Sequence, residues 1–398
     1  MWYTVGMDIQ RTITIGIEPD SDLERTIEAF REVQQRLSEC CYNDGFPLSA
    51  INLQRARYHL VKGSVNAQMT ISAIRTVAGA YQSAKSNKRP ATRPFLFKKA
   101  RALFLIGTRG RDADFRTDGT LSIWTGAGRK HLHYTVPEDF KKTLATAKEI
   151  DSLTVILRSG KLIGRVTLTL DVPDPQGILP VGIDLNETNT LVAVDPDGNT
   201  LFVSGKAIKV KNRRTAKTRA RLQSKHATRK AQHQDTRSIR RVMKRLGRQQ
   251  RNRTRTFAQQ TAKQLVDFAP PHAVLVFEDV HMPQPQKGKI RGAALRRRLS
   301  LWQHGMIRDA VTNKAQERGM VVDKVDPRYT SKNCSRCGLR GKRRRHAFSC
   351  SHCGHTAHAD VNAAYNIRNK FTASRCSGEP SISPEAQTGN GCGQAALL

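Results

Sequence analysis

The chain has 398 residues, of which 38% are hydrophobic, so it is long enough for two or three globular domains and too apolar to be wholly disordered. Lysine and arginine number 68 against 33 acidic residues, which gives a formal net charge of +35. Because so many cations repel one another unless a polyanion neutralises them, we expect the chain to bind nucleic acid. The sequence has neither a run of about 18 apolar residues nor a secretory signal, so we expect no membrane partner.

The first 172 residues predict a β domain that is interrupted by helices. Strand-like runs occur in residues 1–18 and again in 100–172, where Gly-rich turns separate some of them. Residues 19–99 predict a helical insertion. Its first helix starts after a cap at Asp20–Asp22, with apolar residues such as Leu23, Ile27 and Phe30 at helical spacing, and the second covers 64–84. A β-barrel or sheet with a helical insertion fits this order, and two unrelated small domains remain the alternative.

A Pro-, Gly- and Asp-rich segment at 171–177 predicts a domain boundary. Beyond it, the runs 181–185, 191–195 and 201–203 predict a three-stranded antiparallel meander. The continuous apolar run 273–277 predicts a strand buried on both faces. A helix over 302–318, a strand over 320–325, a cysteine-rich module and a helix over 361–368 follow, and residues 371–398 predict a flexible tail.

Residues 206–255 contain 20 lysines and arginines and a single acid, Asp235. Such a run on a free helix would be self-repelling, so we interpret it as a helical element that binds phosphates. Further basic residues occur around the cysteine module. The expected nucleic-acid contacts are Lys211, Arg213, Arg214, Lys217, Arg221, Arg237, Arg240, Arg241, Lys244, Arg245, Arg248, Arg328, Arg343 and Arg344.

Three acids lie in or at the ends of predicted elements: Asp184 in the first meander strand, Glu278 at the end of the buried strand, and Asp360 at the start of the last helix. A buried carboxylate is costly unless it is paired or binds a metal, and carboxylates suit Mg²⁺ or Mn²⁺. Two such ions about 4 Å apart could support phosphodiester hydrolysis, so we expect a metal-dependent nuclease. Taken singly, each acid could instead end a strand, pair with an arginine or cap a helix. Asp279 competes with Glu278, and adjacent strand residues point to opposite faces, so only one can join the site.

Two CxxC pairs form the most specific motif in the chain. Cys334 and Cys337 are followed by Cys350 and Cys353 after 12 intervening residues, and a glycine follows each pair. Four thiolates at this spacing predict a closed, structural Zn²⁺ site of the zinc-ribbon kind. The nearby histidines His346, His352, His355 and His358 are alternative ligands that the paired motif makes unnecessary. The remaining cysteines, Cys40, Cys41, Cys376 and Cys392, are expected to be ordinary thiols.

The segment from Tyr329 to Gly338, the second CxxC pair and the run Asp360–Ile367 closely resemble the C-terminal part of the TnpB family, the transposon-encoded RNA-guided DNA nucleases related to compact type V CRISPR effectors. Residues 181–184 resemble that family's first RuvC motif, 276–280 the second and 360–362 the third. The resemblance is specific over about 178–370, and upstream it rests on the order of elements alone.

The resemblance implies an α+β multidomain fold, with a wedge-like β-barrel, a helical recognition insertion, and an RNase H/RuvC-like nuclease core that contains an inserted zinc ribbon. The implied domains are a wedge (1–18 and 100–172), a recognition insertion (19–99), a nuclease core (178–328 and 358–370, with a basic helical insertion at 206–268), a zinc ribbon (329–357) and a tail (371–398). It also implies a prokaryotic protein in the cytoplasm, associated with the nucleoid.

The implied activity is an endodeoxyribonuclease that pairs a guide RNA (an omega RNA or a CRISPR RNA) with double-stranded target DNA beside a short flanking motif and cuts at a single RuvC-like site. A homodimer is compatible with this implication. The alternatives are a cleavage-deficient relative that silences transcription, a structure-specific nuclease that acts without a guide, and a transposase that joins DNA ends. The zinc ribbon argues against the second alternative, and no added signal favours the third.

Overall fold

The computed structural model describes residues 7–43, 49–88, 91–97, 100–106, 112–280 and 304–376. Contacts within the chain divide these residues into two compact units, one up to Asp171 and the other from Val172 onward. None of the described helices is both long and apolar enough to cross a membrane.

The first unit is built on a seven-stranded sheet with the strand order β2-β6-β7-β1-β5-β4-β3. An isolated bridge between Ile106 and Ala113 joins the two ends of this order, so the sheet is a nearly closed barrel. Its strands are β1 (Met7–Ile17), β2 (Arg101–Leu105), β3 (Ala113–Phe115), β4 (Thr120–Thr125), β5 (Gly128–Thr135), β6 (Glu149–Arg158) and β7 (Lys161–Val172).

In the described part of this unit, four α-helices accompany the sheet: α1 (Ser21–Asn43), α2 (Ala50–Arg57), α3 (Ala67–Ser86) and α4 (Glu138–Ala145), with a short 3-10 helix, η1 (Tyr58–Leu60). The predicted cap of α1 is confirmed, because the backbone N–H of Leu23 donates to Asp20 Oδ1 at 2.7 Å. The two helices predicted from apolar spacing are confirmed as α1 and α3, whose apolar stripes are buried against the sheet. The sequence patterns do not predict the helices α2 and α4 or the strands β3 and β5.

The second unit is built on a five-stranded sheet with the order β10-β9-β8-β11-β12. Its strands are β8 (Leu179–Asp184), β9 (Asn189–Val194), β10 (Thr200–Ser204), β11 (Ala273–Glu278) and β12 (Val321–Val325). The predicted meander is confirmed: β8, β9 and β10 are antiparallel neighbours. The predicted buried strand is β11, and it runs parallel to both β8 and β12.

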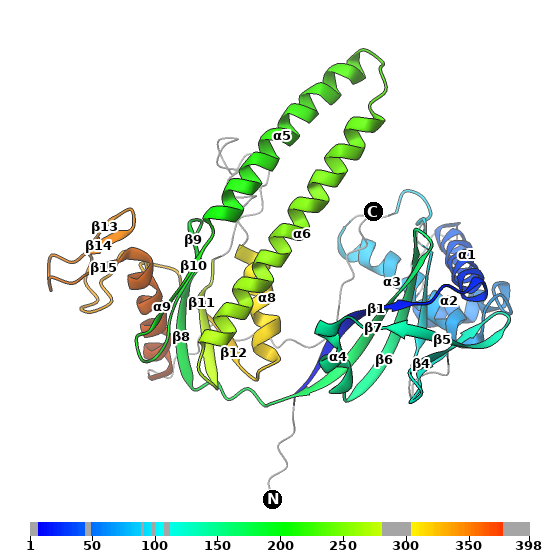
Figure 1. Ribbon diagram of the computed structural model, residues 1–398, viewed down its shortest axis with the longest axis horizontal. Helices are drawn as coiled ribbons and strands as arrows, with labels where there is room; N and C mark the ends of the chain where they lie inside the picture. Colours follow the sequence, from blue (N-terminus) through cyan, green and yellow to red (C-terminus); the bar gives the residue numbers. More distant parts are fainter. Residues whose placement is uncertain are drawn as a thin grey trace, which may run out of the picture. The chain divides into compact units, whose positions relative to one another are not determined.

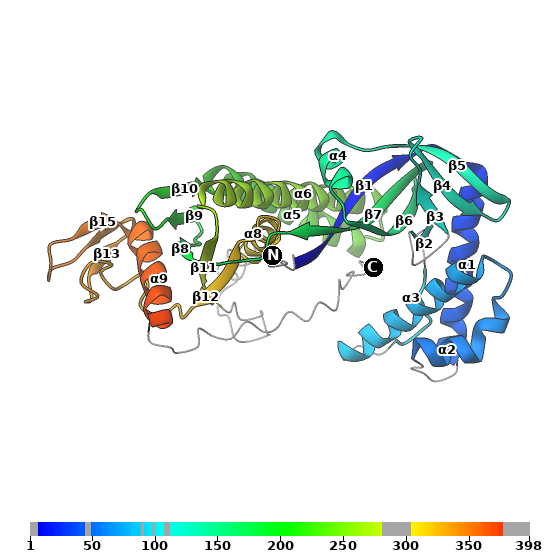
Figure 2. The ribbon, with the colours of Figure 1, turned by 90° about the horizontal axis from the view of Figure 1, so that it is seen from below.

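Helices cover the two faces of this sheet. One face packs on α6 (Arg237–Phe268) and α8 (His304–Gln316) through a core that includes Ile183, Phe277 and Leu265. The other face packs on α9 (Ala359–Cys376), whose Ile367 and Phe371 contact Val274 and Val276. Figures 1 and 2 show α9 on one side of the strands and α6 with α8 on the other. Because α9 continues to Cys376, the prediction of a tail from residue 371 is wrong for 371–376, and residues 377–398 lie outside the described part.

The basic segment folds as two long helices, α5 (Lys206–Ala231) and α6, which lie side by side and extend from the sheet (Figure 1). The core between the two helices is thin, since Ile208 and Asn212 are the buried residues of α5. The two helices are tied by Arg253, which donates from Nη2 to Asn212 Oδ1 and Thr215 Oγ1, both at 3.0 Å. The C-terminal part of α6, by contrast, is buried against the sheet through residues such as Ala262 and Leu265.

Candidate functional site

The strand register aligns two of the predicted acids on one face of the five-stranded sheet. Ile183 on β8 pairs with Phe277 on the parallel strand β11, and both residues are buried in the core beneath α6 and α8. The next residues, Asp184 and Glu278, therefore share a row and point to the opposite face, because successive strand residues alternate in direction. That opposite face is the one covered by α9.

Helix α9 brings the third acid to this face. Asp360 is in the first turn of α9 and is only 1% exposed. The helix lies so close to β8 that a Cβ added at Gly182 would be 2.1 Å from the backbone oxygen of Ala364. A glycine at this position thus allows the close approach that carries Asp360 toward Asp184.

Each oxygen of the Asp360 carboxylate accepts a hydrogen bond. Arg343 Nη2 donates to Oδ1 at 2.8 Å, and Asn189 Nδ2 donates to Oδ2 at 2.9 Å. The helix itself is fastened to the cysteine module, because Asn362 Nδ2 donates to the Asn333 carbonyl at 2.7 Å and Asn366 Nδ2 to the Thr330 carbonyl at 2.7 Å. These contacts fix the position of Asp360 from both sides.

The electrostatics show that the charges of Glu278 and Asp360 act on Asp184. Burial raises the pKa of Asp184 to about 7, with further contributions from the negative charges of Glu278 and Asp360. Burial also raises the pKa of Glu278, although a hydrogen bond from the Thr330 hydroxyl opposes the rise. Like charges that meet in a buried place disfavour ionisation, whereas bound cations would favour it.

The structure separates the predicted competitor from this group. The Asp279 carboxylate lies 3.5 Å from Lys324 Nζ, and its backbone N–H continues the pairing with β12 by donating to the Val325 carbonyl at 2.9 Å. The other acids of the meander serve local structure: Asp195 accepts from the backbone and side chain of Asn199 at 2.8 Å, and Glu187 pairs with Lys209 at 3.1 Å.

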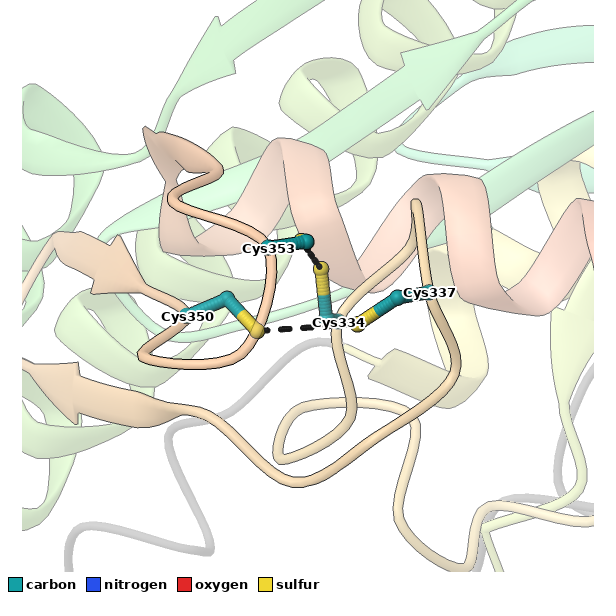
Figure 3. Close-up of side chains that lie close together, drawn as sticks. All are labelled: Cys334, Cys337, Cys350 and Cys353. Atoms are coloured by element: carbon teal, nitrogen blue, oxygen red, sulfur yellow. Dashed lines mark hydrogen bonds between the residues drawn. The ribbon is translucent and has the colours of Figure 1, made fainter.

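The four cysteines of the paired motif converge, as Figure 3 shows. The sulfur atoms of Cys334 and Cys353 are 3.6 Å apart, as are those of Cys337 and Cys350. A disulfide would need about 2 Å, whereas four thiolates around one tetrahedral ion with metal–sulfur bonds of about 2.3 Å lie roughly 3.8 Å from one another. Gly338 and Gly354 follow the two pairs with φ of +76° and +67°, a conformation that glycine adopts without strain. The donor set can therefore hold a metal ion.

The cysteine module also contains a small sheet of β13 (Lys342–Arg344), β14 (Ala347–Ser349) and β15 (Thr356–His358). This sheet places two histidines beside Asp360, which the sequence reasoning did not foresee. His346 Nδ1 and His358 Nδ1 each lie 3.9 Å from Asp360 Oδ2. Nitrogen and oxygen ligands in this arrangement are the kind that transition metals accept, and the only sequence signal was the occurrence of both residues near the second CxxC pair.

The fourteen residues predicted to contact nucleic acid are all exposed. Eleven of them are on α5 and α6, and the other three belong to the cysteine module and the segment before it. Among the carboxylates that the structure describes, three lie within 4.0 Å of one of these cations: Asp235 with Arg237, Asp326 with Arg328, and Asp360 with Arg343. The α5–α6 pair therefore presents a strongly cationic surface.

Two family models match parts of the chain: "Cas12f1-like, TNB domain" over residues 304–367 and the "Probable transposase" model OrfB_IS605 over 164–279. A TnpB-like protein of Aquifex aeolicus is 31% identical over 155 residues, which cover 36% of this chain and 50% of that protein. A CRISPR-associated endodeoxyribonuclease Cas12f1 of Sulfoacidibacillus thermotolerans is 45% identical over 72 residues, 17% of each chain.

The matched segments thus span half or less of these two curated relatives. Among solved structures, that of the mini-RNA-guided endonuclease CRISPR-Cas_phi3 aligns with 12% identity and a TM-score of 0.48, over 96% of this chain and 94% of that one. The sequence matches, and not this distant structural likeness, show the similarity to TnpB-like and Cas12f1 proteins.

Proposed function

We propose that this chain, a relative of the TnpB-like proteins and the compact type V effectors, is an RNA-guided DNA endonuclease with a single metal-dependent site formed by Asp184, Glu278 and Asp360. The observation that carries the proposal is the convergence of these three acids from two parallel strands and the last helix on one face of a sheet. Although Asp360 pairs with Arg343, three carboxylates that gather in a buried place indicate a site for hard metal ions.

The topology supports a RuvC-like, RNase H-like core. Three antiparallel strands are followed by two parallel strands, and the acids lie at the ends of β8 and β11 and at the start of α9. We further propose the nuclease core as residues 178–328 and 358–370, with the basic insertion at 206–268 and the zinc ribbon at 329–357. The barrel and helices before residue 172 would form the wedge and recognition domains.

The donor atoms decide which ions fit each place. Carboxylate oxygens suit Mg²⁺ or Mn²⁺, and Asp184, Glu278 and Asp360 would hold them. When bound, such ions would supply an activated water and stabilise the leaving oxygen in phosphodiester hydrolysis. The four thiols suit a structural Zn²⁺, because they leave no open position.

The protein's own side chains would then orient the site. Asn189 and Arg343 hold the two oxygens of Asp360, and Thr330 donates to Glu278. The exposed cations of α5 and α6 would contact the phosphates of a guide RNA (an omega RNA or a CRISPR RNA) and of the target DNA. Base pairing with the guide would select the target after a flanking motif is bound.

The test is to purify the full chain with its native flanking DNA expressed, to sequence the RNA that copurifies, and to incubate the complex with DNA that matches the RNA's variable end. We expect cleavage that needs Mg²⁺, and its loss in Asp184→Asn, with RNA binding retained. Asp279→Asn is the matched control, since Asp279 pairs with Lys324, and it should still cleave. Undiminished cleavage by Asp184→Asn would remove that residue from the site.

Two other results would redirect the proposal. Binding of matching DNA without cleavage would identify a silencing relative that has lost its nuclease activity. Random copurifying RNA, together with cleavage of branched DNA, would identify a structure-specific nuclease that acts without a guide.

A further inference from the structure

An aromatic ring is exposed on the same sheet face as the proposed catalytic acids. Phe202 on β10 is 46% exposed, although its neighbours Leu201 and Val203 pack into the core. Asp184 pairs with Val192 on β9, and Val192 pairs with Phe202, so the three residues form one row across adjacent strands. Side chains of directly opposite residues share a face, and strands lie about 4.8 Å apart, so Phe202 is roughly 10 Å from Asp184 along this row.

Two more rings extend this surface toward Asp360. His358 meets Phe202 edge to face, with ring centroids 5.2 Å apart and planes at 88°. His346 stacks on His358 with centroids 5.5 Å apart and planes at 22°, and its side chain is 55% exposed. The backbone N–H of Asp360 donates to His358 Nδ1 at 3.3 Å, which holds the His358 ring in place.

Cations border the rings. Arg343 reaches Asp360 from β13, and the three residues of that strand, Lys342, Arg343 and Arg344, are all exposed. Exposed rings beside cationic side chains are the combination that holds single-stranded nucleic acid, because bases stack on the rings while the phosphates contact the cations. A duplex base presents no free face, since both of its faces are stacked on neighbouring bases.

We propose that Phe202, with His358 and His346 behind it, forms a stacking subsite for one unpaired base of the strand that is cut. The subsite holds the base next to the scissile phosphate and so positions that phosphate at Asp184 and Asp360. This inference deepens the proposed nuclease function and rests on it for the identity of the strand. It requires that this base be unpaired at the moment of cleavage, whichever sequence selected the strand.

The experiment uses the full chain with its copurifying RNA and a series of single-stranded DNA oligonucleotides, each with 2-aminopurine at one position. Fluorescence is measured without added divalent cations, so the strand stays intact. We expect quenching at one position, with Kd raised at least about fivefold by Phe202→Ala, the loss expected for one stacked base. Phe202→Trp should retain the quenching. Ile178→Ala, which removes a 63% exposed apolar side chain beyond the far end of β8, should leave Kd unchanged.

An abasic site provides the second arm. When the abasic site replaces the quenched base, it should weaken binding to the wild-type protein by the same factor that Phe202→Ala weakens binding to the intact strand. The same abasic site should cause no further loss of binding in the Phe202→Ala variant. The subsite would be overturned if the abasic site and Phe202→Ala weakened binding by separate factors that multiply when the two are combined. It would also be overturned if the Kd of Phe202→Ala were within twofold of wild type. Base-dependent quenching by a chain that never cleaves with Mg²⁺ would overturn the nuclease proposal alone, whereas cleavage without any quenching that depends on Phe202 would overturn the subsite alone.

Discussion

Gly182→Ala should separate the last helix from the sheet and damage the site without touching any of its acids. A Cβ at residue 182 would lie 2.1 Å from the Ala364 oxygen, 2.8 Å from the Arg368 nitrogen and 2.9 Å from the Arg368 Cβ. Two of these atoms are backbone, so no side-chain rotation can remove the clash. Ordinary contact begins at 3.4 Å, so α9 must move by roughly 1.3 Å.

The size of the effect follows from where Asp360 is attached. It lies on α9 four residues before Ala364, about one helical turn away, so it must move with the helix. Displacement of a catalytic group by about 1 Å can cost on the order of 100-fold in rate, and overpacking of this kind costs about 1–3 kcal/mol of unfolding free energy. We therefore expect kcat for matched DNA to fall about 100-fold and the denaturant midpoint to fall with it.

The control is Gly305→Ala in α8, because a Cβ there would meet nothing within 4 Å. It should leave kcat unchanged and should not reduce stability, since alanine favours a helix over glycine. Metal content of the cysteine module and RNA binding should be retained in both variants. A Gly182→Ala protein with wild-type stability and kcat would show that α9 does not pack on β8 as described.

Three further predictions concern the metal module, the acids and the basic helices. Cys334→Ser should lose the metal of the cysteine module, since the apparent binding free energy of zinc in small zinc domains is about 10–16 kcal/mol. Metal analysis checks this, with Cys40→Ser as the control, and full metal content in Cys334→Ser would contradict it. In protein assayed without Mg²⁺, the free energy of unfolding should fall as pH rises from about 4 to about 7, because the folded pKa of Asp184 lies above its ordinary value of 3.8 and the folded state binds more protons in that window. Asp184→Asn should flatten the fall, and an unchanged slope would point to other groups. Removing Lys217 and Arg221 together should lower the magnitude of the slope of log binding constant against log salt by about 1.8 for duplex DNA. The control is Lys141→Ala, whose amine pairs with Glu138 at 2.8 Å, and an equal change in that variant would argue against a specific role for α5.

Local patterns in the sequence were sufficient for the elements that bury a regular apolar stripe. The spacing of Leu23, Ile27 and Phe30 predicted α1 because those side chains are the ones the helix buries. The same reasoning missed β5, where Leu132 is the buried residue among polar neighbours, and α4, which buries none. A sequence pattern can indicate only those elements that bury apolar residues at regular helical or strand spacing.

The sequence alone thus determined the cationic character of the chain, the paired cysteines, and the acids at strand and helix ends. Tertiary structure decided which of these come together. The parallel pairing of β11 with β8 aligns Glu278 with Asp184, and the close approach of α9 at Gly182 adds Asp360. The same packing brings His346 and His358 beside Asp360 and turns Asp279 toward Lys324. Contacts between residues far apart in the chain depend on strand order and helix packing, which no local spacing encodes.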